Sequence, residues 1–195
     1  RGGQFQKEEV SAIHPEEGST QINNTYYDQV VICTGAFSKS LVKQIEGQFI
    51  PLETERGYHI EFTEKQQLLS RPTSLVESGM YLTPLNNRLR AAGTVELGGL
   101  HSNISQARID YIARDAKRLL PSLQDYQNPW LGYRPTLPDC LPVLGRSPKF
   151  KNIFYAFGHN HLGWTLGPTT GKLITDLISH GREINSVYSI SRYLS

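Results

Sequence analysis

A segment rich in glycine and histidine, Phe157–Pro168, stands directly before an apolar stretch with helical spacing. Glycine allows a ligand to approach the backbone closely. A helix that begins after this segment would present free N–H groups and the positive end of its dipole, which stabilise a phosphate, a carboxylate or an anionic ring. An ordinary turn between a strand and a helix has the same composition, so the segment taken alone leaves both interpretations open.

Arg134 also has a setting that suggests chemistry, because it lies between Tyr133 and Pro135 where a strand is expected to enter a loop. A guanidinium can bind a carboxylate through two parallel hydrogen bonds. Tyr81, at the expected start of another strand, could donate its hydroxyl to the same carboxylate. A surface salt bridge for the arginine and simple packing for the tyrosine are the alternatives.

Several other functional patterns are absent from the sequence. His159 and His161 are two residues apart, and neither they nor Cys140 have partners at the spacing of a zinc site, so we expect no metal. The patterns GxSxG and HExxH and the phosphate-binding P-loop do not occur. Among the 17 glycines no two are separated by a single residue, so any GxGxxG dinucleotide fingerprint has to lie outside this sequence.

The composition is that of an ordinary globular protein, with a net charge of +2 over 195 residues. No stripe of lysine and arginine indicates a nucleic-acid partner, and no apolar run approaches the roughly 18 residues of a membrane span. The chain begins at Arg1 and its only methionine is Met80, so we expect further sequence to precede it. For Cys33 and Cys140 we expect two buried thiols in a reducing compartment, with a single disulfide as the alternative.

The pattern of hydrophobicity predicts several strands in the first half of the chain. The apolar run Gln29–Cys33 is typical of a strand buried on both faces. Gly57–Phe62 alternates apolar and polar residues, as expected of a strand with one buried face. Met80–Leu85 and Leu89–Val95 flank Asn86-Asn87, which favours a hairpin.

Two helices are predicted in the second half. One begins at Ser105, which can cap it, and ends before Pro121. Its apolar residues fall on one face: Ile109, Ile112, Ala113, Ala116, Leu119 and Leu120. A short strand is expected at Asn152–Phe157, followed after the glycine-rich segment by a helix over Pro168–Ser179 that Gly181 terminates.

Four segments, in their order and spacing, carry a resemblance to a known family. They are Val30–Ser38, Arg56–Tyr58, Gly132–Gly145 with its Arg-Pro, Pro-Asp and Pro-Val-Leu-Gly pieces, and Gly158–Gly171. Together they resemble the FAD-dependent oxidoreductases of the D-amino-acid oxidase type, a group that includes glycine oxidases, sarcosine oxidases and bacterial D-amino-acid dehydrogenases. The last segment is most similar to the closing motif of the D-amino-acid dehydrogenases.

The resemblance implies a fold of the α+β and α/β classes. An antiparallel substrate-binding sheet with helices would be flanked by the C-terminal elements of a Rossmann-like FAD-binding domain, whose GxGxxG half is absent from this sequence. Residues 1–44 and 135–195 would belong to the FAD-binding domain, and residues 45–134 would form the substrate-binding domain.

The resemblance also implies FAD as the cofactor and assigns residues to the site. The residues expected to bind FAD are Val10, Thr34, Gly35, Gly57, Gly158, His159, Leu162, Gly163, Trp164 and Thr165. Arg134 would bind the substrate carboxylate, with Tyr81 assisting and His161 at the same site. His161 stands where glycine oxidases carry an arginine, which favours the dehydrogenase branch.

The implied reaction is the oxidative deamination of amino acids, with D-amino acids favoured, by hydride transfer to the flavin, giving a 2-oxo acid and ammonia. A secondary amine or 2-hydroxy acid, with sarcosine, proline and glycine-like compounds as examples, is the alternative substrate. A binding module or an inactive fragment is the alternative to an enzyme. The expected partners are the small substrate and an electron acceptor, oxygen or a quinone, in the cytoplasm or peripherally on the inner membrane.

Overall fold

The computed structural model describes residues 2–63 and 68–194, which form two compact units. The first unit consists of the segment that ends at Leu52 together with Pro135–Ser195, and the second consists of Glu53–Arg134. The first unit is therefore assembled from segments that are far apart in the sequence, and it extends past the boundary expected at residue 45.

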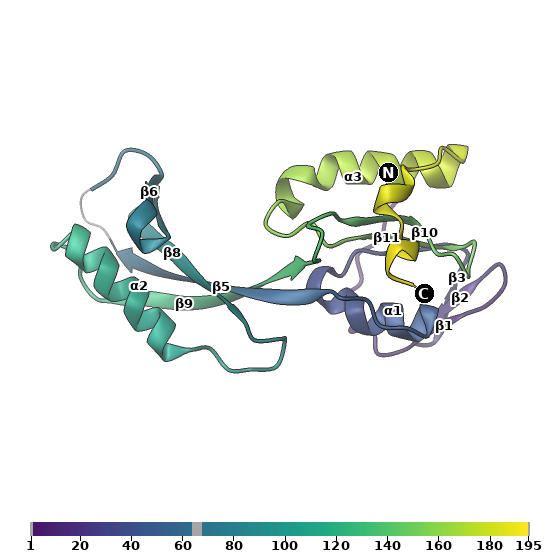
Figure 1. Ribbon diagram of the computed structural model, residues 1–195, viewed down its shortest axis with the longest axis horizontal. Coiled ribbons are helices and arrows are strands. Elements are labelled where there is room, and N and C mark those ends of the chain that lie inside the picture. The colour runs from purple at the N-terminus through teal and green to yellow at the C-terminus, as the bar shows by residue number, and fades with distance from the viewer. Residues whose placement is uncertain (1, 64–67, 195) are drawn as a thin grey trace. The chain divides into compact units, whose positions relative to one another are not determined.

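Two small sheets form the first unit (Figure 1). The first is an antiparallel meander of β1 (Ile13–Pro15), β2 (Thr20–Ile22) and β3 (Thr25–Tyr27). In the second, β10 (Val143–Arg146) pairs antiparallel with β11 (Ile153–Phe157), and β11 pairs parallel with β4 (Val30–Ile32). The parallel pair places a strand from the beginning of the chain beside one near its end, which explains why both predicted strands are apolar.

Helix α1 (Ser38–Glu46) covers part of the core of the first unit. Its buried Leu41, Val42 and Ile45 share a face and pack with residues of β11, and Gly47 ends the helix with a φ of 75°. This nine-residue helix was not predicted from the sequence. Four short 3-10 turns complete the two units: Gly35–Phe37, Val76–Ser78, Ser186–Tyr188 and Ile190–Tyr193.

Helix α3 (Gly163–His180) begins earlier than the predicted Pro168. The residues Gly163–Gly167, which were expected to form a loop, are helical, and Pro168 lies inside the helix, where it supplies no backbone N–H. The predicted terminator is confirmed, since Gly181 has a φ of 65° and its N–H donates to the carbonyl of Leu177.

A five-stranded sheet and one helix form the second unit (Figure 1). The strand order is β6-β7-β8-β5-β9, and the pairs β6–β7, β7–β8 and β8–β5 are antiparallel. The strand bounds are Thr73–Leu75 for β6, Met80–Leu85 for β7, Arg88–Leu97 for β8, Glu53–Thr63 for β5 and Tyr126–Thr136 for β9. The predicted hairpin is confirmed, with Asn87 in the left-handed region of its turn.

Helix α2 (Gln106–Leu119) covers one face of this sheet, as its apolar spacing predicted. Ser105 holds the N-cap position with an extended backbone, although its side chain makes no capping hydrogen bond. Tyr58, Ile60 and Phe62 of β5 pack in the same core as Ile109 and Ile112. The residues between them point to the opposite face, because successive side chains of a strand alternate. This opposite face is called the open face below.

Candidate functional site

A cavity of about 560 Å³ lies in the first unit, between the ends of β4 and β11, the loop that follows β11, and one side of α3. Its volume falls in the range of small-molecule and cofactor sites. Val31, which was expected to lie in a strand buried on both faces, is 36% exposed and lines this cavity. The prediction for that strand is therefore wrong on one face, because the space beside it is hollow rather than filled by side chains.

Three residues of α3 that line the cavity are glycines, so no side chain projects into the cavity from these positions. Gly163, Gly167 and Gly171 recur every four residues and all line the cavity. A Cβ added at Gly167 or Gly171 would meet no atom within 4 Å. These glycines therefore do not serve close packing against the described residues; they leave free space along the helix.

The loop between β11 and α3 is held in a defined conformation. Gly158 has a φ of 84°, and a Cβ there would lie 2.7 Å from Leu137 Cδ1. The imidazole Nε2 of His159 lies 2.9 Å from the hydroxyl of Thr170, and the N–H of Asn160 donates to the carbonyl of Pro135 at 3.1 Å. These contacts fix the loop against both α3 and Pro135, which belong to the same unit.

Three features of the cavity wall would suit a bound polar ligand. No acidic residue lies in the first turn of α3, and its N-cap residue Leu162 offers no side-chain hydrogen bond, so the first N–H groups remain available. Burial lowers the pKa of His159, which keeps its ring neutral. Asn160 Oδ1 is buried without a hydrogen-bond partner among the described residues.

The residues present therefore fit FAD, the cofactor that the resemblance implies. Glycines leave room for a large flat ring, free helix N–H groups suit electron-rich atoms, and the unpaired Asn160 oxygen can accept a hydrogen bond. No described group of three or more His, Cys, Asp or Glu residues is arranged to hold a metal ion.

The structure brings together some of the residues predicted to bind FAD. Gly35, Gly158, His159 and Gly163 line the cavity, and Gly167 and Gly171, which were not predicted as site residues, line it too. Cys33, Asn160 and Thr170 line it as well and were not predicted.

The other predicted FAD residues lie outside the cavity lining. Thr34 adjoins the lining and its hydroxyl pairs with Ser38 at 2.9 Å. Leu162, Trp164 and Thr165 surround the start of α3, and Trp164 is 98% exposed. Val10 precedes β1, and Gly57 belongs to the second unit.

Both cysteines differ from expectation. Cys33 and Cys140 are free and exposed, so the predicted burial of the two thiols is wrong and no disulfide joins them. Cys33 is exposed because it follows β4 at the mouth of the cavity.

The second unit positions Arg134 on its open face. The guanidinium lies against Gly57, where an added Cβ would be 3.2 Å from Arg134 Nη2. Arg134 is half-buried and forms no hydrogen bond or ion pair with any residue that the structure describes. A guanidinium that is partly desolvated and unpaired is available for a carboxylate from a ligand.

Tyr81 lies on the same open face. It pairs with Ala92 across β7 and β8, and Ala92 pairs in turn with His59 of β5. His59 stands two residues after Gly57, so all of these side chains point to one face of the sheet. Tyr81 is 60% exposed. His161, the third predicted substrate residue, is an exposed residue of the first unit, and its role remains a prediction.

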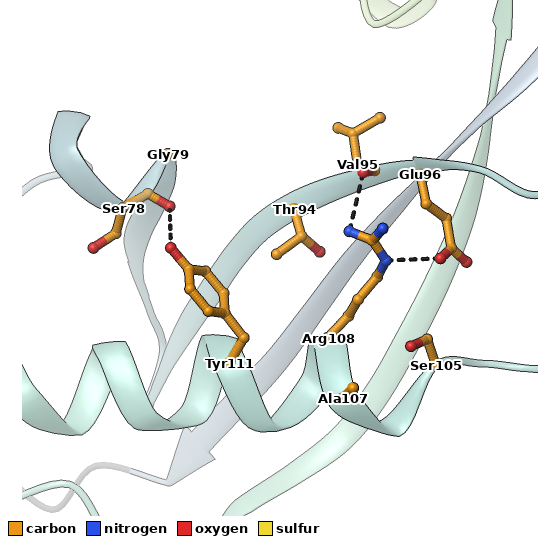
Figure 2. A pocket seen from close by; sticks show the side chains of 9 residues that line it. All are labelled: Ser78, Gly79, Thr94, Val95, Glu96, Ser105, Ala107, Arg108 and Tyr111. Carbon is orange, nitrogen blue, oxygen red and sulfur yellow. Dashed lines mark hydrogen bonds and ion pairs between the residues drawn. The ribbon is translucent and has the colours of Figure 1, made fainter.

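A larger cavity, of about 710 Å³, lies beside α2 in the second unit (Figure 2). Its charged groups are already paired, although the buried Oγ1 of Thr94 has no hydrogen-bond partner among the described residues. Arg108 donates to Glu96 at 2.7 Å and to the carbonyl of Val95 at 3.0 Å, and the Tyr111 hydroxyl donates to the carbonyl of Ser78 at 3.2 Å. Hydrogen bonds from Tyr58 and Arg108 hold the pKa of Glu96 below its usual range. We therefore regard it as a weaker candidate than the cavity beside α3.

In the portions of the chain that the structure covers, no helix combines the length and apolarity needed to cross a membrane.

Comparisons of the sequence and of the fold with known proteins identify relatives of the chain. A sequence model of the family described as FAD dependent oxidoreductase (DAO) matches residues 1–177. The chain is 34% identical to a D-amino-acid oxidase of Bradyrhizobium diazoefficiens over 82% of its own length and 39% of that protein. It is also 34% identical to a D-amino acid dehydrogenase of Vibrio atlanticus, over 97% of the chain and 48% of that protein.

Among solved structures, a glycine oxidase from Geobacillus kaustophilus superimposes with a TM-score of 0.82 at 25% identity. The match covers 96% of this chain and 52% of the oxidase. The chain thus spans about half the length, or less, of these relatives. The extent of the family match and the identity to these relatives show that the chain belongs to the DAO family of FAD-dependent oxidoreductases.

Proposed function

We propose that this chain contributes the substrate-binding face and part of the flavin site of an enzyme that deaminates amino acids oxidatively, with D-amino acids as the preferred substrates. The unpaired, half-buried guanidinium of Arg134 on the open face carries the proposal. The names of relatives at 34% identity, a D-amino-acid oxidase and a D-amino acid dehydrogenase, support the substrate class.

Arg134 binds the substrate carboxylate through its two terminal nitrogens. Tyr81, on the same face, donates its hydroxyl to that carboxylate. Two anchors on one face of a single sheet restrict the rotation of the substrate and fix the direction of its Cα–H bond. The substrate amine enters the reaction neutral and needs no protein base, and the imine product is hydrolysed to the 2-oxo acid and ammonia.

FAD, when bound, would supply the hydride acceptor for the substrate Cα–H bond, and oxygen or a quinone would take up the electron pair from the reduced flavin. The α3 glycines leave room for its ring, and the N–H groups of the first turn of α3 would stabilise negative charge on it. Asn160 Oδ1, which is buried and has no partner among the described residues, would accept a hydrogen bond from the bound group.

A second candidate function uses Arg134 in the same way but acts on another class of substrate. Arg134 recognises a carboxylate, so an acid with a secondary amine, proline and sarcosine among them, or a 2-hydroxy acid would bind equally well. An L-proline dehydrogenase and an iminodiacetate oxidase share the fold of this chain at TM-scores of 0.79 and 0.74. A binding module without activity is the third candidate, and it predicts that the protein retains no FAD.

Replacing Arg134 tests the assignment. In the FAD-loaded protein that carries this chain, Arg134→Ala should lower kcat/KM for amino acids roughly 30-fold or more. This corresponds to about 2 kcal/mol of transition-state stabilisation, because a charge-assisted hydrogen-bonded pair is lost. Arg134→Lys should restore only part of the loss, since an ammonium cannot bind the carboxylate in the same two-pronged way.

Arg114→Ala is the matched control. Arg114 is an exposed arginine of α2, the helix on the opposite side of the same sheet, and it pairs with Asp115. It should leave kcat/KM within twofold, about 0.4 kcal/mol. Equal kcat/KM in Arg134→Ala and Arg114→Ala would show that Arg134 does not bind the substrate.

A further inference from the structure

We propose that the stacked ring pair of His59 and Trp130 selects the substrate side chain, and that it accepts planar or large apolar side chains such as that of phenylalanine. This inference rests on the proposed function, because it takes Arg134 as the anchor of the carboxylate. The two rings have centroids 4.7 Å apart and planes inclined by 19°, so they form a flat stack on the open face.

Gly132 allows this stack to form. A Cβ at Gly132 would lie 2.0 Å from Trp130 Cη2 and 2.4 Å from Cζ3. The indole therefore lies directly above Gly132, on strand β9, and any larger residue there would displace it. Despite the stack, Trp130 remains 53% exposed, so much of the indole surface is available for a ligand.

The stack lies within reach of a substrate held by Arg134. Gly132, beneath the indole, is two residues from Arg134 on β9, and His59 is two residues from Gly57, which lies under the guanidinium. Two residues along a strand span roughly 7 Å. A side chain of the length of phenylalanine covers that distance from a carboxylate at Arg134, whereas the methyl group of alanine does not.

Small residues leave room beside the stack. Ala92 separates His59 on one side from Tyr81 on the other, because the three residues pair across adjacent strands. A methyl group between two larger rings leaves space for a flat group from a ligand. Tyr81 and Trp130 are both more than half exposed, so both rings are accessible to a ligand.

The charges around the stack favour an apolar ligand. Glu61, which follows on the same face, is bound by Arg88 at 2.6 Å and by Arg90 at 3.0 Å, and Asn128 donates to it as well. Burial and the nearby Arg90 lower the pKa of His59, which leaves the imidazole neutral near pH 7. The carboxylate that follows His59 on this face is therefore paired, and the two rings of the stack carry no charge.

A pair of simple carboxylates tests the stack without the reaction. Phenylacetate and acetate share the carboxylate that Arg134 binds, and only phenylacetate carries a ring. The chain has two tryptophans, so Trp164→Phe makes Trp130 the only indole. Phenylacetate should change the emission of Trp130 and bind roughly tenfold more tightly than acetate, in line with the strength of an aromatic pair plus its buried area.

Variants of the stack should lose the preference for phenylacetate over acetate but still bind the carboxylate at Arg134. In ligand-detected NMR titrations, Trp130→Ala and Gly132→Ala should lower the affinity for phenylacetate to that for acetate. The affinity for acetate itself should stay unchanged. Trp130→Phe should recover much of the preference because it restores a ring. Gly132→Ala displaces the indole without removing it, which separates loss of the stack from loss of the residue.

The possible results distinguish this inference from the proposed function. Equal affinity for phenylacetate and acetate in the unmodified chain would overturn the side-chain site and leave Arg134 as an anchor. If neither acid binds and Arg134→Ala leaves kcat/KM for amino acids unchanged, both the side-chain site and the role of Arg134 are overturned. In the FAD-loaded protein the ratio of kcat/KM for phenylalanine to that for alanine should fall about tenfold in Gly132→Ala. An unchanged ratio would show that the stack is only structural.

Discussion

Glycine residues on the cavity side of α3 reduce the stability of that helix and leave space beside it. A Cβ added at Gly171 would have no neighbouring atom within 4 Å, and the φ of this residue lies in the ordinary range. Gly171→Ala should therefore stabilise the chain by up to about 1 kcal/mol, the difference in helix propensity. The new methyl group enters the cavity, so FAD affinity should fall at the same time.

Thermal unfolding of the chain and FAD titration of the cofactor-stripped protein measure these two effects. Ser179→Ala is the control, because it improves helix propensity on an exposed position of α3 that does not line the cavity. It should leave FAD affinity unchanged. A Gly171→Ala variant that binds FAD as tightly as the unmodified protein would place the flavin elsewhere.

His159 gives the stability of the first unit a dependence on pH. Burial lowers its pKa in the folded state, whereas an unfolded histidine titrates near 6.5. Below about pH 7 the unfolded chain then binds more protons than the folded chain, so stability is lost as the pH falls through the unfolded value. Urea midpoints measured from pH 7.5 to 5 should fall, and they should fall less in His159→Gln, which keeps a partner for Thr170. Equal slopes would contradict this account.

At the scale of the elements, the buried side chain of Glu46 joins α1 to the sheet formed by β10, β11 and β4. Glu46 is fully buried, and the hydroxyls of Tyr155 and Ser147 both donate to its Oε1 at 2.6 Å. Its Oε2 has no partner among the described residues. Tyr155→Phe should destabilise the chain by about 1–3 kcal/mol, because a buried acceptor loses a donor.

Urea unfolding measures this loss, with Tyr26→Phe as the control because Tyr26 is exposed on β3. A change of less than about 0.5 kcal/mol, the range of ordinary surface substitutions, would show that the hydroxyl does not stabilise the contact.

Elements with a regular apolar pattern were predictable from the sequence, and shorter or irregular ones were not. The spacing of Ile109, Ile112 and Ala116 identified α2, and the Asn86-Asn87 turn identified the β7–β8 hairpin. The start of α3 was placed too late, because glycine has a low helix propensity and Pro168 is typical of a first turn. Helix α1 was not predicted because nine residues provide little periodicity.

The candidate site was predictable only where its residues are neighbours in sequence. The recurrence of Gly163, Gly167 and Gly171 is visible in the sequence, and the structure shows that all three line the cavity. The row formed by Tyr81, Ala92 and His59 depends on the register of three strands, which sequence patterns do not specify. The exposure of Cys33 likewise depends on the hollow beside β4.

At the scale of the whole molecule, the two compact units carry different parts of the proposed chemistry. The first contains the cavity with its glycines and free helix N–H groups, and the second contains Arg134 and the stacked rings. The chain spans 39% and 48% of the length of the two curated relatives described above. The activity is therefore a property to be measured on the FAD-loaded protein that carries this chain.

Anaerobic titration of that protein with D- and L-amino acids, glycine, sarcosine and proline, followed by the absorbance of the oxidised flavin, tests the central claim most directly. The account predicts that D-amino acids bleach the flavin, with D-phenylalanine effective at lower concentration than D-alanine. In Arg134→Ala, much higher concentrations of either amino acid should be needed for the same loss of absorbance. A protein that retains FAD but whose absorbance none of these acids changes would contradict the assignment of an amino-acid substrate.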